Sequence, residues 1–254
     1  MATSSRLSQF HELAKYYDAL NDWKDYREET RRLEAIARRF GRPGKTTWLD
    51  VACGTGRHLE FLRHRHRTTG VDGSREMLRI ARRRLPGVPL VLGDMRTVRL
   101  GREFDVVSCL FGAIGHLPTA RDVERTFANL ARHLTPGGVA IVEPWIDRST
   151  FRPGSLHLRT HVDPDLTIAR LAYSSRRGRQ SRIHYHFLVG RPGDDVRYVQ
   201  ETDDGVLLTR EELLRLMRKV GLDARILSRG FSPGRGLIVA TKPKGASPIP
   251  KRSP

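Results

Sequence analysis

Two glycines and an acid follow a short apolar run near residue 50. The stretch "DVACGTG" covers residues 50–56, and a helical pattern starts directly after it at Arg57. Glycine-rich turns between a strand and a helix let a nucleotide approach the backbone closely. A dinucleotide-binding turn has a third glycine where this chain has Leu59, so a pyrophosphate ligand is disfavoured. A carboxylate at the end of the strand, Asp50, instead suits a ligand that carries a positive charge.

Two more aspartates stand where strands are expected to end. Asp72 closes the run "TTGVD", and Asp94 follows "LVLG" with Met95 beside it. A carboxylate at the carboxyl end of a parallel strand commonly binds ribose hydroxyls. Taken alone, each aspartate is equally typical of a turn or a helix N-cap. Together with the glycine turn, the three acids predict one crevice for a nucleotide-like ligand.

These turns need a parallel sheet to bring them together. Apolar runs alternate with helical stretches from residue 46 to residue 145, after an amphipathic helix predicted over 25–40. Strands are expected over 46–52, 68–72, 88–94, 104–111 and 137–145, and helices over 57–66, 74–85 and 121–134. This alternation is typical of a parallel sheet with helices on both faces.

The pattern changes after residue 155. Four alternating segments between residues 155 and 202 are separated only by turn signals, which predicts an inserted antiparallel sheet. A helix over 209–222, opened by Thr209 and closed by Gly221, and a final antiparallel strand pair follow. The tail from Pro243 has four prolines and no core residues, so we expect it to be disordered.

The composition narrows the class of protein. The formal net charge is +18, but 39 of the 46 basic residues are arginines spread along the whole chain, so a dedicated nucleic-acid surface is disfavoured. Cys53 and Cys109 form no metal-binding motif or disulfide framework. The sequence has neither a signal peptide nor a run long enough to cross a membrane, which predicts a cytoplasmic protein.

The motifs resemble those of class I S-adenosylmethionine-dependent methyltransferases. "LDVACGTG" resembles motif I, "GVDGSREML" the acidic segment after it, "GDMR" the adenine-contacting motif, and "LTPGG" the turn before the fifth strand. The resemblance implies an α/β, Rossmann-like fold: a mostly parallel seven-stranded sheet with helices on both faces, here with an inserted antiparallel cap. It also implies S-adenosyl-L-methionine as cofactor.

The same resemblance assigns roles to residues. Gly54 and Gly56 would lie against the methionine part of the cofactor, Asp72 would bind the ribose hydroxyls, and Asp94 would bind the adenine amino group. Met77 and Met95 would flank the adenine ring. The full cofactor set expected is Tyr17, Asp50, Ala52, Gly54, Gly56, Asp72, Gly73, Met77, Asp94, Met95 and Leu110.

His116 is the candidate catalytic residue. It lies in "CLFGAIGHL", after the fourth strand, where the methyl acceptor should sit. An amine must lose its proton before it can attack a sulfonium methyl, and a histidine can accept or guide that proton. A structural histidine in the core or at a helix cap is the alternative. The motifs of enzymes that methylate nucleic-acid bases, Asn/Asp-Pro-Pro-aromatic and a Pro-Cys nucleophile, are absent.

A wider resemblance covers residues 16 to 241. "HLE", "ARRRLP", "IGHL", "VEPW", "HF" and "GRGL" resemble the TDP-amino-sugar N,N-dimethyltransferases of desosamine and mycaminose biosynthesis. The resemblance implies that His116 is the active-site histidine, that Trp145, Arg235, Tyr26 and His186 line the acceptor cleft, and that the inserted sheet supports a homodimer. This sequence departs from the family pattern at Gly112-Ala113, where the family has Ser-Ser, and at Ile146, where the family has Trp.

The resulting hypothesis is an N-methyltransferase for the amino group of a phosphate-bearing small molecule, most simply a TDP-linked amino-sugar. Alternatives are an N- or O-methyltransferase with a non-nucleotide acceptor, and a nucleic-acid-associated protein. We expect no metal, because His184 and His186 share a strand face without a third ligand. The predicted parts are a helical lid (1–45), a cofactor-binding domain (46–154 and 203–242), a cap (155–202) and the tail (243–254).

Overall fold

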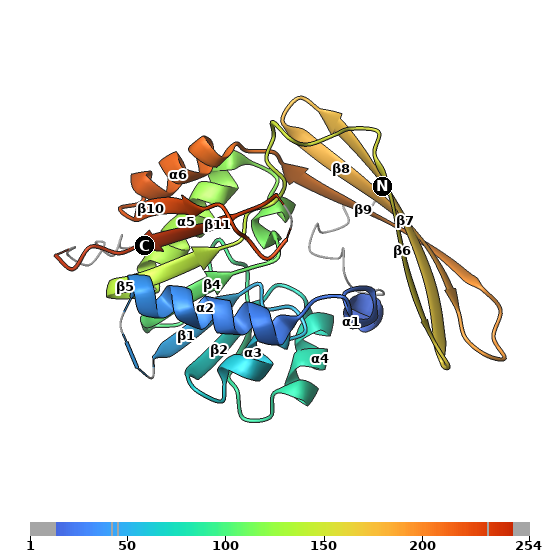
Figure 1. Cartoon of the computed structure of the whole chain (residues 1–254), viewed down its shortest axis with the longest axis horizontal. Coiled ribbons are helices and arrows are strands. Elements are labelled where there is room, and N and C mark those ends of the chain that lie inside the picture. The colour runs from blue at the N-terminus through green and yellow to red at the C-terminus, as the bar shows by residue number, and fades with distance from the viewer. Residues whose placement is uncertain (1–13, 42, 45, 233, 246–254) are drawn as a thin grey trace.

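Two β-sheets organise the chain (Figure 1). The structure, a computed structural model, describes residues 14–41, 43–44, 46–232 and 234–245, so residues 1–13 of the predicted lid and 246–254 of the predicted tail lie outside the described part. The central sheet has the order β10-β11-β5-β4-β1-β2-β3, and only β11 runs antiparallel to its neighbours. Its strands are β1 (Thr47–Val51), β2 (Arg67–Asp72), β3 (Leu90–Leu92), β4 (Phe104–Cys109), β5 (Leu134–Val142), β10 (Asp223–Leu227) and β11 (Leu237–Thr241). The predicted fold class is confirmed.

Helices cover both faces of the central sheet. They are α2 (Tyr26–Phe40), α3 (Arg57–Leu62), α4 (Arg75–Arg84), α5 (Ala120–Arg132) and α6 (Arg210–Lys219). One apolar core joins α2, α3 and α4 to one face around Trp48, and a second joins α5 and α6 to the other face around Phe127. Burying apolar side chains on both faces stabilises the sheet and fixes where its strand ends lie.

The helices begin where the sequence predicts, because polar side chains cap their free backbone amides. Asp25 accepts a hydrogen bond from the Glu28 amide at 2.9 Å, and Thr209 forms the predicted capping box. The helix after the glycine turn ends at Leu62, four residues before its predicted end. The chain must turn there, because β2 already begins at Arg67.

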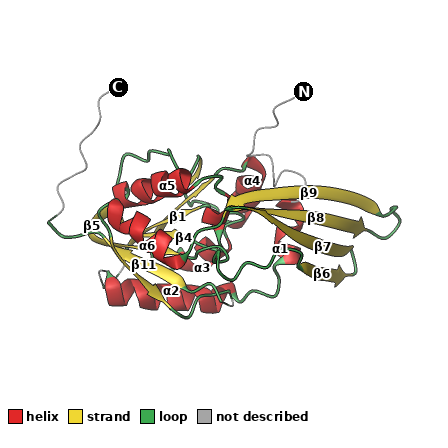
Figure 2. Cartoon of the chain, turned by 90° about the horizontal axis from the view of Figure 1, so that it is seen from above, coloured by secondary structure: helices red, strands yellow, loops and turns green. Residues whose placement is uncertain are grey.

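The inserted segment forms a second sheet, which we call the cap sheet. Its antiparallel strands are β6 (Leu156–Asp163), β7 (Leu166–Arg177), β8 (Gln180–Gly190) and β9 (Arg197–Val206), in the order β6-β7-β8-β9. Figure 2 shows it projecting from the helical body. β9 continues four residues past the expected segment and reaches the loops of the central sheet.

A short helical segment lies between the two sheets. It consists of η1 (Ala14–Tyr16) and α1 (Tyr17–Leu20). Tyr16 and Leu20 pack on Ile168, Phe187 and Val189 of the cap sheet. On its other side, Asp18 accepts hydrogen bonds from Thr55 and Arg84, both at 2.6 Å. This segment therefore connects the glycine turn to the cap sheet.

None of the helices in the described ranges has the length and apolar composition that crossing a membrane requires.

The junction between β9 and the His116 turn leaves no room for a side chain. This turn is the short helix η2 (Ala113–His116). A Cβ atom on Gly205 would lie 1.6 Å from the Gly115 carbonyl oxygen. Next to it, the Val206 amide donates a hydrogen bond to the Leu117 carbonyl at 2.9 Å. The backbone of β9 is thus fixed directly against the turn that carries His116.

We expect Gly205→Ala to lower the free energy of unfolding by about 1–3 kcal/mol or more, because the methyl group must push two backbones apart. Gly190→Ala is the matched control, since a Cβ at Gly190 meets only Val196, at 3.7 Å. Urea unfolding of both variants measures the difference. Equal stability of the two variants would contradict the close contact.

Candidate active site

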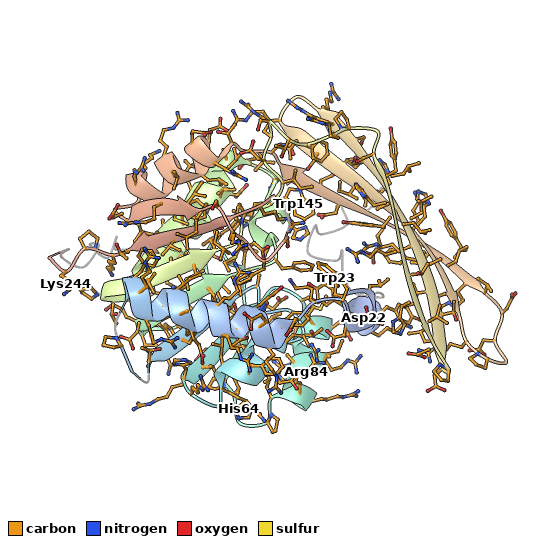
Figure 3. All side chains as sticks on the ribbon, in the orientation of Figure 1. Asp22, Trp23, His64, Arg84, Trp145 and Lys244 are labelled. Atoms are coloured by element: carbon orange, nitrogen blue, oxygen red, sulfur yellow. The ribbon has the colours of Figure 1, made fainter. Side chains whose placement is uncertain are left out.

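A cavity of about 700 Å³ lies where the carboxyl ends of the central strands face the cap sheet. Figure 3 shows Trp23 and Trp145 in this space, between the two sheets. The predicted site residues that line it are Tyr17, Tyr26, Asp50, Ala52, Gly54, Asp72, Gly73, Met77, Asp94, Met95, Leu110, His116, Trp145 and Arg235. Two predicted site residues, Gly56 and His186, do not line it. Segments far apart in the sequence therefore contribute to one site.

The carboxylate of Asp72 shapes the glycine turn. It accepts hydrogen bonds from the Gly54 amide and the Ser74 amide, each at 2.8 Å. Ala52 and Gly54 have positive φ angles of 59° and 56°, so the backbone is bent into the left-handed region beside the cavity. Burial raises the pKa of Asp72, and the backbone hydrogen bonds partly offset that rise. Lone pairs remain on this carboxylate for ligand hydroxyls.

Gly56 has a different role from the one its motif implies. Its φ is 79°, and a Cβ atom there would lie 2.5 Å from Leu85 Cδ1. Its amide donates to the Cys53 carbonyl, so it is not available to a ligand. Gly56 therefore lets α3 pack against α4 behind the cavity wall. The expected contact between Gly56 and the methionine part of the cofactor is wrong, because Gly56 does not line the cavity.

Asp94 and Met95 lie at the predicted adenine end of the cavity. Arg96 binds the Asp94 carboxylate, with Nε 2.9 Å from Oδ1, and also reaches Asp122 at 3.1 Å. The hydrogen bond from Arg96 lowers the pKa of Asp94, so this carboxylate is ionised at neutral pH. Arg96 thereby fixes the direction in which Asp94 presents its remaining lone pairs.

Asp50 is buried in β1 and also lines the cavity. Ser108 donates a hydrogen bond to it at 2.7 Å, and the Trp48 indole donates in turn to Ser108 at 2.9 Å. Burial raises the pKa of Asp50 to about 6, although His58 and Ser108 favour its charged form. A nearby ligand cation would favour the charged form further.

Trp145 and Arg235 form the acceptor side. The Arg235 guanidinium lies 4.4 Å from the Trp145 ring centroid, and Gly112 and Gly115 leave the space that both side chains fill. Burial lowers the pKa of Arg235, and its Nη1 atom has no hydrogen-bond partner among the described residues. A buried, incompletely bonded guanidinium favours an anionic ligand.

Glu143, which the sequence analysis did not single out, positions these loops. It is fully buried at the end of β5, and it accepts hydrogen bonds from the Phe111 amide at 2.8 Å and the Ser232 amide at 2.9 Å. Phe111 has a φ of 54°, a bend that this carboxylate stabilises. The sequence did carry a signal for this role, because Glu143 directly follows an apolar strand, as Asp72 ends one.

His116 lies on the cavity wall beside an acid that the sequence analysis also missed. Its Nδ1 atom is 2.7 Å from Oδ2 of Asp203, a buried residue of β9. Burial alone would lower the pKa of His116, but the charge of Asp203 and the hydrogen bond that its carboxylate accepts from the ring raise the pKa overall. Arg235 acts against this rise and Asp72 adds to it.

Two arginines of the cap sheet also face the cavity. Arg159 and Arg170 are directly opposite each other on β6 and β7, and the ion pairs of the described residues include no carboxylate partner for either. Their guanidinium groups lie over aromatic rings, Arg159 over Trp23 at 4.4 Å and Arg170 over Tyr185 at 5.4 Å. Like charges at opposed positions repel, so an anion between them would be favoured.

His186 lies on the other face of the cap sheet, which corrects its expected place in the acceptor cleft. The two faces alternate along β8, and Tyr185 and Phe187 are the residues that line the cavity. His186 instead contacts the Tyr198 hydroxyl at 2.5 Å on the outer face. His184 shares that outer face, and its ring lies 5.9 Å from the Tyr173 ring.

Comparisons with known proteins show which sequences and structures this chain resembles. A family model described as a methyltransferase domain matches residues 49–138. The dTDP-3-amino-3,6-dideoxy-alpha-D-glucopyranose N,N-dimethyltransferase of Streptomyces fradiae is 39% identical over 230 residues, 89% of each chain. The crystal structure of DesVI from Streptomyces venezuelae has a TM-score of 0.85 and 37% identity, with 90% of this chain and 98% of that chain covered. CalS10, an amino pentose methyltransferase from Micromonospora echinaspora solved with bound SAM, has a TM-score of 0.81 and 35% identity, with 92% and 97% covered.

Binding of S-adenosylhomocysteine should depend on the protonation of Asp50. With a pKa of about 6, this carboxylate takes up a proton as the pH falls from 7 to 5. If the amino group of the ligand binds the ionised carboxylate, affinity is full above pH 7 and weakens below pH 6, by at most about tenfold per pH unit. Titration calorimetry between pH 5 and pH 8 measures this dependence.

Asp50→Asn should bind more weakly at pH 8 and show a flatter pH profile. Asp72, whose pKa burial also raises, contributes in the same direction and remains in the variant. An affinity that stays constant from pH 8 to pH 5 in the unchanged protein would contradict this role for Asp50.

Proposed function

This chain belongs to the family of dTDP-amino-sugar N,N-dimethyltransferases, and we propose that it transfers methyl groups from S-adenosyl-L-methionine to the amino group of a nucleotide-linked amino-sugar. The observation that carries the proposal is the composition of a single cavity. It combines carboxylates at the strand ends, a histidine, and arginines contributed by the cap sheet. Such a site can bind a cationic cofactor and an anionic acceptor together.

The cofactor supplies a methyl group on a positively charged sulfur. In this proposal Asp72 binds its ribose hydroxyls, Asp94 binds its adenine amino group, and Met77 and Met95 flank its adenine ring. These roles follow from the family motifs and from the position of each side chain on the cavity wall. The segment η1–α1 lies over this region, with Tyr17 lining the cavity, and excludes water from the reacting groups.

His116 acts on the acceptor amine. The amine attacks with its lone pair, a carbon–nitrogen bond forms, and the carbon–sulfur bond breaks with its electrons remaining on sulfur. The proton that the nitrogen must lose passes to His116. The pKa of His116 is raised by Asp203, which makes the ring a better proton acceptor. Proximity and alignment within the cavity supply the rest of the rate enhancement.

The nucleotide part of the acceptor requires sites for phosphate. Arg235, which was predicted to line the acceptor cleft, is one candidate, and the cap sheet adds Arg159 and Arg170. Arg170 is half-buried, and its Nε atom has no hydrogen-bond partner among the described residues. Burying a guanidinium without hydrogen bonds is costly, and a phosphate oxygen would relieve that cost.

The test of the function is calorimetry followed by an assay. The protein should bind S-adenosylhomocysteine, and the complex should then bind dTDP; with a dTDP-amino-hexose and S-adenosyl-L-methionine, mass spectrometry should detect N-methylated product. Binding of S-adenosylhomocysteine without dTDP would contradict a nucleotide-linked acceptor and favour a small amine or alcohol. Micromolar binding to random duplex DNA that is lost at high salt would favour the nucleic-acid alternative.

Arg170→Met should weaken dTDP binding by about 10- to 100-fold, the value of one or two charge-assisted hydrogen bonds, and leave S-adenosylhomocysteine binding unchanged. Arg177→Met, at an exposed position of the same strand that does not line the cavity, is the matched control. Equal dTDP affinity of the two variants would remove Arg170 from the phosphate site.

We also propose that the outer face of the cap sheet binds a second copy of the chain. This face carries apolar side chains across all four strands: Leu156, Leu158, Val162, Leu171, Tyr173, Leu188 and Tyr198, each 41–73% exposed. The positions of this face among them, 160, 167, 169, 184, 186, 200 and 202, hold no Lys or Arg, although the chain has 46. The arginines of this face, Arg177 and Arg182, lie beyond Tyr173 and His184, and Arg182 pairs with Asp204. A patch that lacks the chain's most abundant charge suits contact with an identical, equally cationic copy.

Leu158→Glu combined with Leu171→Glu should convert a dimer into a monomer, because the contact would bury four carboxylates. Sedimentation equilibrium measures the mass. Leu92→Glu, which charges an exposed leucine of the central sheet, is the control and should leave the dimer intact. If the unchanged protein still sediments as a monomer at about 100 times its concentration in the methylation assay, the proposal is refuted.

A further inference from the structure

Two adjacent aspartates of β9 have opposite environments. Asp204 pairs with Arg182 of β8, with separations of 2.6 and 2.7 Å, where both side chains are partly exposed. Asp203 points the other way, and its side chain is only 9% exposed. Its Oδ2 atom lies 2.7 Å from Nδ1 of His116, and its Oδ1 atom has no hydrogen-bond partner among the described residues. A buried carboxylate is costly unless a charge or donor compensates it, and His116 supplies that here.

The backbone fixes the distance between the two groups. Gly205, two residues after Asp203, lies directly against Gly115, the residue before His116. The Val206 amide donates to the Leu117 carbonyl, and the Gln180 side chain donates to the Pro118 carbonyl at 2.8 Å. The opposite side of the His116 turn rests on Trp145, since a Cβ at Gly115 would lie 2.4 Å from that ring. Neither group can move far without breaking these contacts.

We propose that Asp203 is the positioning residue of His116: its carboxylate accepts the Nδ1 proton, so that Nε2, with its lone pair, is the nitrogen presented to the acceptor amine. The inference rests on the proposed N-methyl transfer, in which His116 takes a proton. In a neutral imidazole only one nitrogen carries a proton, and the partner of the other decides which. Asp203 also stabilises the imidazolium that forms when the proton arrives.

This arrangement has a consequence for the dependence of the rate on pH. His116 must be neutral to accept a proton, so the rate rises with pH through the pKa of this group in the bound complex. The charged groups that act on it are Asp203 from β9, Asp72 at the end of β2 and Arg235 from the loop before β11. Asp203 raises the pKa of His116, so removing its charge should move the acid limb of the profile to lower pH.

The experiment compares Asp203→Asn with the unchanged protein in two ways. First, ¹⁵N NMR of the imidazole nitrogens, with S-adenosylhomocysteine bound and His116→Gln used for assignment, identifies the protonated nitrogen. We expect the Nδ1–H form in the unchanged protein and loss of that preference in the variant. Second, kcat should fall by about 10- to 100-fold, because the general base keeps its place but loses its orientation. KM should stay within about twofold, and the acid limb should shift to lower pH.

Glu34→Gln is the matched control, because it removes the same charge from another carboxylate that pairs with a histidine. Glu34 lies 3.3 Å from His66, and neither residue lines the cavity. It should leave the acid limb in place. Asp203→Glu, which keeps the charge, should retain the Nδ1–H signal and the position of the limb even if Asp203→Asn folds poorly. Thermal unfolding of each variant checks the fold.

The outcomes separate the two proposals. An unshifted acid limb and an unchanged tautomer in Asp203→Asn, with methyl transfer still observed, would overturn the role of Asp203 and leave the proposed function standing. The NMR measurement needs no acceptor, so Nδ1–H protonation that depends on Asp203 supports the pairing even if no amino-sugar is methylated. The absence of methylated amino-sugar in that case would refute the proposed function and leave the role of Asp203 standing.

Discussion

Buried carboxylates at the carboxyl ends of parallel strands, bonded to the backbone amides of the following loops, are the interaction on which this site depends. Asp72 bonds to the glycine turn and to the start of α4. Glu143 does the same for the loops that contain Phe111 and Ser232. Loops with positive φ angles are costly by themselves, and each carboxylate compensates that cost by bonding two amides at once. The cavity between these loops is preorganised as a result.

The cofactor half of the site could be predicted because one geometric rule governs it. Strand ends of a parallel sheet meet at one edge, so Asp50, Asp72 and Asp94 converge without any knowledge of tertiary contacts. The fold class followed from the same alternation of strand and helix. Gly56 shows the limit of the motif, because a glycine that a ligand needs and a glycine that helix packing needs have the same pattern in sequence.

The acceptor half could be predicted only in part, because an antiparallel strand has two faces and the sequence does not say which faces inward. Tyr16 and Leu20 determine which face of the cap sheet is inward, since they pack on the face that carries Phe187. His186 therefore faces outward, whereas Arg170 lines the cavity and Asp203, opposite Ile183 on the inner face, pairs with His116. The pairing of Asp203 with His116 joins residues far apart in the chain, and only the junction at Gly205 brings them together.

That junction also limits how such enzymes can be recombined. Exchanging the cap sheet for that of a relative is an obvious way to change the acceptor, and most of the cap has its own apolar contacts and its own hydrogen-bonded strands. The incoming β9 must nevertheless supply a residue with no side chain opposite the Gly115 carbonyl and an acid two positions earlier. A chimaera with a well-shaped acceptor pocket but a bulkier residue at this joint would separate the histidine from its carboxylate and fail at the chemical step.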